Sequence, residues 1–160
     1  MVEIVTGSIF DATEKYICHQ CNCVTKKAAH LSKDMFQHFP FADVYTGRAT
    51  PNEPGTISVK GNGIDQRYVI NIFGQFYPGY PKEALGDLDG YDARAKYFYH
   101  GLLRIAKIPN LESIAFPWKV GCGAADGDWE VYQGNIENFA KYVEQSQGTK
   151  VVIYRREGDK

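Results

Sequence analysis

Residues Tyr16 to Val24, with the sequence YICHQCNCV, decide how the rest of the chain is interpreted. The apolar run Tyr16–Cys21 predicts a short buried strand, which ends in the polar residue Asn22. Residues 28 to 39 then place apolar side chains at helical spacing, and the pattern stops at Pro40, where a helix cannot readily continue. The stretch therefore predicts a strand, a loop and a helix in succession.

Strands and helices alternate along the remainder of the chain. We expect further strands at 2–5, 56–60, 67–73, 113–116 and 151–154, and further helices at 91–106 and 129–144. The turn Gly61-Asn62-Gly63 joins two of these strands into a hairpin, and residues 77–89 are expected to form an irregular loop. The pattern predicts a single α/β domain over residues 1–160, with a mixed sheet because the hairpin adds antiparallel pairing.

The composition is that of an ordinary globular protein. Of the 160 residues, 44% are hydrophobic and 23% are charged, and the formal net charge of −1 excludes a general nucleic-acid-binding surface. No apolar run approaches the ~20 residues that a membrane helix needs, and the first residues do not resemble a signal peptide, so we expect a cytoplasmic protein. Three of the four cysteines lie within six residues, which favours reduced thiols over a disulfide framework.

Two loops follow predicted strands at the position where α/β proteins bind ligands. They are residues 22–30 and 118–129. In the second loop, Gly121-Cys122-Gly123 allows positive φ and close backbone approach, and a helix beginning near Asp128-Trp129 would present free N–H groups to an anion. A diphosphate would fit such a loop, although the glycines are equally compatible with a simple turn between a strand and a helix.

The sequences of both loops resemble those of one family. HQCNCV at His19–Val24 and IAFPWKVGCGAADGDWE at Ile114–Glu130 resemble the macrodomains, which bind or hydrolyse ADP-ribose compounds. Within that family they are similar to the branch of ADP-ribose 1''-phosphate phosphatases and terminal ADP-ribose glycohydrolases. The resemblance implies a three-layer α/β/α fold with a mixed central sheet, a partner that is ADP-ribose or an ADP-ribosylated ligand, and no cofactor.

The resemblance also implies a set of ligand-binding residues. Asn22 corresponds to an asparagine that faces the distal ribose, and Ser8 stands where the family usually has an aspartate for the adenine amine. A serine hydroxyl can accept the same hydrogen bond but carries no charge. The ligand-binding residues implied are Ser8, Ile9, Asn22, Gly121, Cys122, Gly123, Ala124 and Trp129.

Two departures from the family pattern affect the chemistry that we expect. Residues 26–30 read Lys-Lys-Ala-Ala-His where the family has a run of glycines, so this loop should take another shape and could favour a more anionic ligand. Gln75 and Ala125 stand where the glycohydrolases use a lysine and an aspartate. A glycohydrolase mechanism would therefore require Lys82 or Asp126 to act from a shifted position.

Hydrolysis of ADP-ribose 1''-phosphate is the leading functional hypothesis. His19, Asn22 and Asp126 are the expected catalytic residues, because His19 can titrate near neutral pH and Asp126 lies beside the glycines. A buried structural histidine is the alternative for His19, and Asp128 is expected to be either a site residue or the cap of the following helix. The other functional candidates are a reader of ADP-ribose without catalysis and a glycohydrolase that removes ADP-ribose.

The cysteines and aromatic residues suggest further possibilities. His19, Cys21, Cys23 and His30 could converge on zinc, but neighbouring strand residues are poor tetrahedral ligands, and we expect no metal. Cys122 could be a reactive thiolate near a helix N-terminus, although no partner base is evident. Aromatic side chains that could line a ligand cleft are Phe73, Phe76, Tyr77, Tyr80 and Trp118.

Overall fold

The computed structural model describes residues 1–160 and contains one six-stranded sheet in the order β1-β6-β5-β2-β4-β3. All neighbouring strands pair in parallel except β3, which pairs antiparallel with β4. The strands are β1 (Glu3–Thr6), β2 (Tyr16–Cys21), β3 (Ile57–Lys60), β4 (Tyr68–Phe73), β5 (Ser113–Pro117) and β6 (Lys150–Arg155). The helices are α1 (His30–His38), α2 (Gly86–Asp89), α3 (Tyr91–Ile105) and α4 (Trp129–Gln147), with 3-10 turns at Ile9–Asp11, Pro40–Ala42 and Glu83–Leu85.

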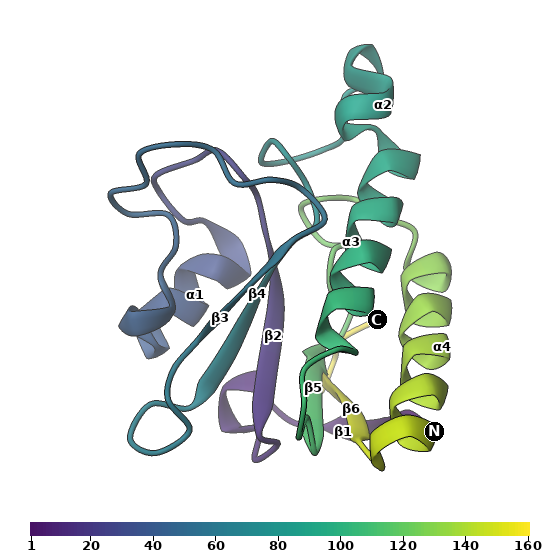
Figure 1. The fold of residues 1–160 in the computed structure, drawn as a ribbon. Helices are drawn as coiled ribbons and strands as arrows, with labels where there is room; N and C mark the ends of the chain where they lie inside the picture. The colour runs from purple at the N-terminus through teal and green to yellow at the C-terminus, as the bar shows by residue number, and fades with distance from the viewer.

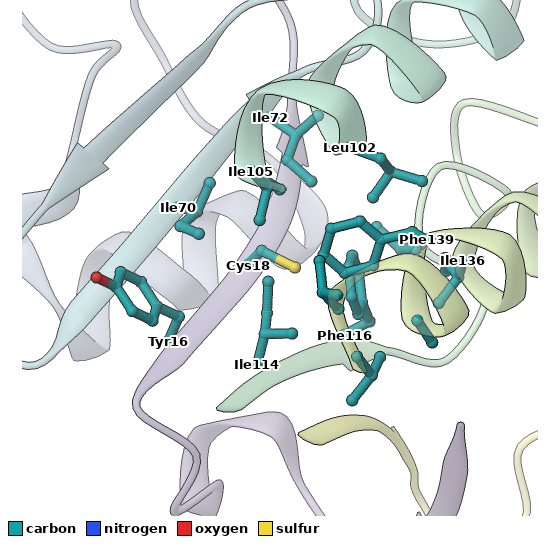
Figure 2. Packing of buried hydrophobic residues seen from close by; sticks show 14 of the residues in the cluster. Tyr16, Cys18, Ile70, Ile72, Leu102, Ile105, Ile114, Phe116, Ile136 and Phe139 are labelled. Atoms are coloured by element: carbon teal, nitrogen blue, oxygen red, sulfur yellow. The ribbon is translucent and has the colours of Figure 1, made fainter. Parts of the chain in front are cut away.

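Helices cover both faces of the sheet, as Figure 1 shows, with α1 on one side and α3 and α4 on the other. Successive side chains of a strand point to opposite faces, so β2 contributes to two separate cores. Ile17 and Cys21 pack with Met35 and Phe36 of α1. On the opposite face, Cys18 lies in the larger core beneath α3 and α4, part of which is drawn in Figure 2.

The elements agree closely with the sequence-based expectations. The α/β class, the mixed sheet and the three layers are confirmed, and the 61–63 turn joins β3 to β4 as an antiparallel hairpin. Residues 77–89 are not wholly irregular, because they contain a 3-10 turn and the short helix α2. No helix combines the length and the apolar character that a membrane crossing requires.

This topology gathers five loops at one edge of the sheet. Strands β1, β6, β5, β2 and β4 are parallel, so their carboxyl ends point the same way. In such sheets ligands bind in the crevice just beyond those carboxyl ends. The loops at this edge therefore form the place to look for a site.

Candidate functional site

The principal cleft has a volume of about 560 Å³ and lies across the carboxyl ends of the parallel strands. Every parallel strand contributes to it through the loop that follows. Gly7 and Ile9 follow β1, and further residues of the wall come from the ends of β2, β5 and β6 and from the segments after β6, β5, β2 and β4. Both loops that the sequence singled out therefore reach one cleft. Its side chains from those loops are Asn22, Thr25, Lys27, His30, Trp118 and Lys119.

Positive charge is concentrated around this cleft although the chain as a whole has a net charge of −1. Four cationic side chains line it, against the single carboxylate of Asp159. The cations come from three different loops and are Lys27, Lys119, Arg156 and Lys160. A local excess of cations in a cleft attracts an anionic ligand without making the whole surface basic.

The glycine loop after β5 confirms the expected tight turn. Gly121 has φ 76°, and a Cβ atom at this position would lie 2.6 Å from the Tyr132 ring and 2.7 Å from Gln20 Oε1. Only glycine fits there without displacing a buried neighbour. Gly123 and Ala124 line the cleft with their backbone, and Gly123 has no crowding around its Cα.

The expectation that the start of α4 binds an anion has no support in the geometry, because neither Asp128 nor Trp129 lines the cleft. The Asp128 carboxylate accepts a hydrogen bond from Glu130 N at 3.1 Å, so Asp128 is a helix cap and not a ligand-binding residue. The first turn of α1 takes the place of α4 at the cleft. Ala29, His30, Leu31 and Ser32 line the cleft, and no side chain caps this helix.

Asn22 lines the cleft, but its side chain also shapes the loop. Its Oδ1 accepts hydrogen bonds from Val24 N and Thr25 N, both at 3.0 Å, and its Nδ2 donates to Thr25 Oγ1 at 3.0 Å. Most of its hydrogen-bonding capacity is therefore satisfied within residues 22–25. One amide hydrogen remains for a ligand.

His19 does not lie on the cleft. It is fully buried between β4 and α1, where Nε2 is 2.5 Å from Asn71 Oδ1 and Nδ1 is 3.3 Å from Ser32 Oγ. Burial lowers the pKa of His19 to about 4, although the hydrogen bond to Asn71 opposes that shift. The geometry therefore supports the alternative of a structural histidine and does not support the expected catalytic role.

Asp126 also lies outside the cleft lining. Its Oδ2 accepts a hydrogen bond from the phenol of Tyr91 at 2.6 Å, and this bond is the main reason that the pKa of Tyr91 is raised. Asp126 thus connects the glycine loop to the start of α3. Its expected role in activating water has no geometric support, because its immediate neighbour Ala125 lines the cleft while Asp126 does not.

Three of the expected ligand residues have other contacts. Ser8 caps the first 3-10 turn by accepting from Phe10 N at 3.2 Å, whereas its neighbours Gly7 and Ile9 line the cleft. Trp129 stacks edge-on against Trp118, which does line the cleft. Cys122 packs against the larger core, and desolvation raises the pKa of its thiol to about 12, which contradicts a reactive thiolate.

The four residues of the zinc hypothesis do not form a cluster of ligands. His30 is exposed at the start of α1, whereas His19 and Cys21 are buried beneath that helix, and no group of three or more potential ligands is found.

Of the aromatic residues expected at the cleft, Phe73 belongs to the core and Tyr80 is exposed. The aromatic wall of the cleft comprises Trp118 together with Tyr45 and Tyr154, which the sequence did not single out.

A buried ion pair holds the β4 side of the cleft. The Asp89 carboxylate accepts Arg94 Nε at 3.1 Å and Nη2 at 2.8 Å, and it also accepts the backbone N–H groups of Phe76 and Tyr77. Arg94 is 2% exposed and donates further to the carbonyls of Gly79 and Ala125. The pair therefore ties the loop after β4 to the glycine loop.

Removal of Arg94 should destabilise the protein more than any surface change on the same helix. Arg94→Ala leaves the Asp89 carboxylate buried without its partner, at an expected cost of about 3–5 kcal/mol in the free energy of unfolding. Arg94→Lys should cost less, because it keeps the charge but loses the two-pronged contact. Urea denaturation measures both variants, and Lys96→Ala on the exposed face of α3 is the control. Equal stability of Arg94→Ala and the control would contradict this role.

Protonation of His19 should destabilise the folded state in mild acid. An unfolded histidine has an ordinary pKa near 6.5, so as the pH falls from 6.5 to 4 the unfolded chain binds a proton that folded His19 does not. The native state should lose about 3 kcal/mol across that window and nothing further from this group below it. Urea denaturation of the wild type and His19→Gln at pH 7 and pH 4 measures the difference.

His100→Gln, on the exposed face of α3, is the control for the pH measurement and should keep the acid sensitivity of the wild type. If His19→Gln and the wild type lost stability equally between pH 7 and pH 4, the buried neutral histidine would not be its source.

The chain is similar to known proteins in structure but matches none of them by sequence search. No family model matches the chain, and no curated protein matches its sequence. The macrodomain of Thermus aquaticus DarG superposes with a TM-score of 0.71 at 22% identity, over 97% of this chain and 98% of that one. The Mycobacterium tuberculosis DarG macrodomain gives 0.70 at 20% identity, over 96% and 97% of the two chains.

A third structure was solved with a ligand. It is the Trypanosoma brucei macrodomain in complex with ADP-ribose, which superposes with a TM-score of 0.66 at 14% identity, over 97% of this chain and 63% of that chain. This chain therefore has the macrodomain fold.

Proposed function

We propose that the protein binds ADP-ribose or an ADP-ribose derivative in the cleft at the carboxyl edge of its sheet. The observation that carries this proposal is the continuity of the cleft from the loop after β1 to the loop after β4, with the glycine loop between them. Four strand spacings of ~4.8 Å separate those two strands, a span of about 19 Å. A span of this length suits an extended ligand with groups on both sides of a diphosphate.

The chemistry along the cleft changes in the order that such a ligand requires. The aromatic residues Trp118 and Tyr154 line the cleft on the β5 and β6 side, and aromatic side chains suit a purine base. The glycine loop and Lys119 lie in the middle and suit a diphosphate. The β2 and β4 side carries the amides of Gln20 and Gln75, which suit sugar hydroxyls. The ADP-ribose found in the trypanosomal relative supports the same assignment.

Hydrolysis of ADP-ribose 1''-phosphate is a second candidate. Water would attack phosphorus, the bond from phosphorus to the 1''-oxygen would break, and that oxygen would take a proton, leaving ADP-ribose and inorganic phosphate. His30 and Lys27 favour this candidate, because they line the cleft and could move a proton and neutralise phosphate. They would replace His19 and Asp126 in those roles.

The observations favour binding over either hydrolysis. A glycohydrolase needs a nucleophile and an acid, and the corresponding positions hold the Gln75 amide and Ala125. Lys82 and Asp126, the residues that could act from a shifted position, do not line the cleft. Lys82 is exposed, and Asp126 accepts a hydrogen bond from Tyr91. The residues of the cleft therefore favour a protein that binds ADP-ribose without hydrolysing it.

Calorimetric titration with ADP-ribose tests the binding directly. We expect saturable binding that weakens as salt is raised, because the ligand is anionic. Lys27→Ala should lower the affinity about two- to fivefold, as expected for one solvent-exposed cation that lines the cleft. The neighbouring Lys26 does not line the cleft, so Lys26→Ala is a matched control that should bind like the wild type. Absence of binding at millimolar ligand would overturn the proposal.

Phosphate release from ADP-ribose 1''-phosphate separates the two candidates. A reader should release none above the uncatalysed rate. If release does occur, His30→Ala should abolish it while ADP-ribose still binds, since His30 is the histidine that lines the cleft. Release that survives in His30→Ala would contradict the role given to that residue.

A further inference from the structure

Residues Arg156–Asp159 form a tight turn directly after β6. Asp159 N donates to the Arg156 carbonyl at 3.0 Å, and Arg156 N donates to Asp159 Oδ2 at 2.9 Å. Both residues line the cleft, and Asp159 is partly exposed. The turn therefore brings a carboxylate to the cleft with one of its two oxygens already bonded.

This turn is held against Trp118, the tryptophan of the aromatic wall. Arg155 donates from Nε and Nη2 to the Asp159 carbonyl, at 3.0 and 2.6 Å, and its guanidinium lies 4.4 Å from the centroid of the Trp118 ring. The indole Nε1 donates to the carbonyl of Lys160 at 3.2 Å. Asp159 is thus flanked on both sides by contacts with Trp118, at the end of the cleft where the proposed function places the base.

The other polar side chains near this end are engaged elsewhere. Ser8 accepts from Phe10 N and does not line the cleft, and the phenol of Tyr154 donates to Glu14 Oε1 at 2.7 Å. Asp159 supplies the only carboxylate of the cleft lining, and its Oδ1 makes no hydrogen bond within the protein. The side-chain acceptor left free at this end is therefore Asp159 Oδ1.

The chemistry of a carboxylate limits what it can meet in this cleft. An ionised carboxylate only accepts hydrogen bonds, and a charged acceptor binds a donor more strongly than a neutral one. Beside a diphosphate it would repel the ligand, whereas beside a base it can accept from a neutral amino group. Adenine carries such a donor, the amino group at position 6.

We propose that Asp159 Oδ1 accepts a hydrogen bond from the 6-amino group of the adenine base, which makes Asp159 a specificity-determining residue. The inference rests on the proposed function, because it needs the base beside Trp118 and the diphosphate at the glycine loop. It deepens that function by naming the side chain that selects the base. A purine without the amino group leaves the carboxylate without a donor.

Titration of the wild type and Asp159→Asn with two ligands tests this inference. The ligands are ADP-ribose and its analogue with unsubstituted purine in place of adenine. Asparagine keeps the size of the side chain, and its oxygen can still accept from Arg156 N, which turns its NH2 group toward the ligand. We expect the wild type to bind ADP-ribose about tenfold more tightly than the analogue, and Asp159→Asn to bind the two equally.

The ratio of the two affinities is the decisive readout. Both ligands carry the same diphosphate, so the general effect of removing a negative charge changes both affinities alike and cancels in the ratio. Glu157→Gln is the matched control, because it removes a charge from the same turn at an exposed residue that does not line the cleft. This variant should keep the tenfold preference of the wild type.

Each remaining outcome overturns a stated claim. A preference that survives in Asp159→Asn would mean that another group contacts the amine, and the inference would fall. A wild type that binds both ligands equally would also refute it, while the proposed function would stand. A wild type that binds neither ligand would overturn the proposed function itself, and the inference with it.

Discussion

Asp89 and Arg94 form an ion pair that is almost fully withdrawn from water at the start of α3, and the geometry of the cleft depends on it. Such burial is costly unless every polar atom finds a partner. Here the carboxylate accepts four hydrogen bonds, and the guanidinium reaches carbonyls in both the loop after β4 and the glycine loop. The helix, the sheet edge and two cleft walls are thereby fixed together. Arg94 also donates to the Tyr77 carbonyl, which accepts a hydrogen bond from the Gln75 side chain.

Strand β2 places one side chain in the protein interior and the next side chain at the cleft. His19 and Gln20 are adjacent, so the strand sends them to opposite faces of the sheet. His19 pairs with Asn71 under α1, where its neutral form completes a buried polar network. Gln20 faces the other side and lines the cleft. A difference of one residue along the strand separates a side chain buried under α1 from one that lines the cleft.

The sequence predicted the elements better than the roles of their side chains. Helix α4 was located correctly because Asp128 caps its start and Gly148, in the left-handed conformation, closes its end. The two loops were recognised because each follows a predicted strand and because their sequences resemble those of the macrodomains. The Asp89–Arg94 pair was missed, because Asp89 ends α2 and Arg94 lies in α3, and no local pattern in the sequence marks their pairing. The catalytic roles expected of His19 and Asp126 have no support in the geometry, because a sequence does not reveal which neighbour will satisfy a polar side chain.

The polar groups of the cleft explain why recognition is better supported than catalysis. The polar side chains of its buried lining residues are amides and the hydroxyls of Ser32 and Tyr45, which form hydrogen bonds without exchanging protons at neutral pH. The groups that do carry charge are the carboxylate of Asp159 and exposed lysines and an arginine from the surrounding loops. Exposed cations speed the arrival of an anionic ligand and contribute modestly to its affinity, whereas fixed amides discriminate between hydroxyl patterns. Attraction and discrimination are thus assigned to different residues, and neither task requires a bond to be broken.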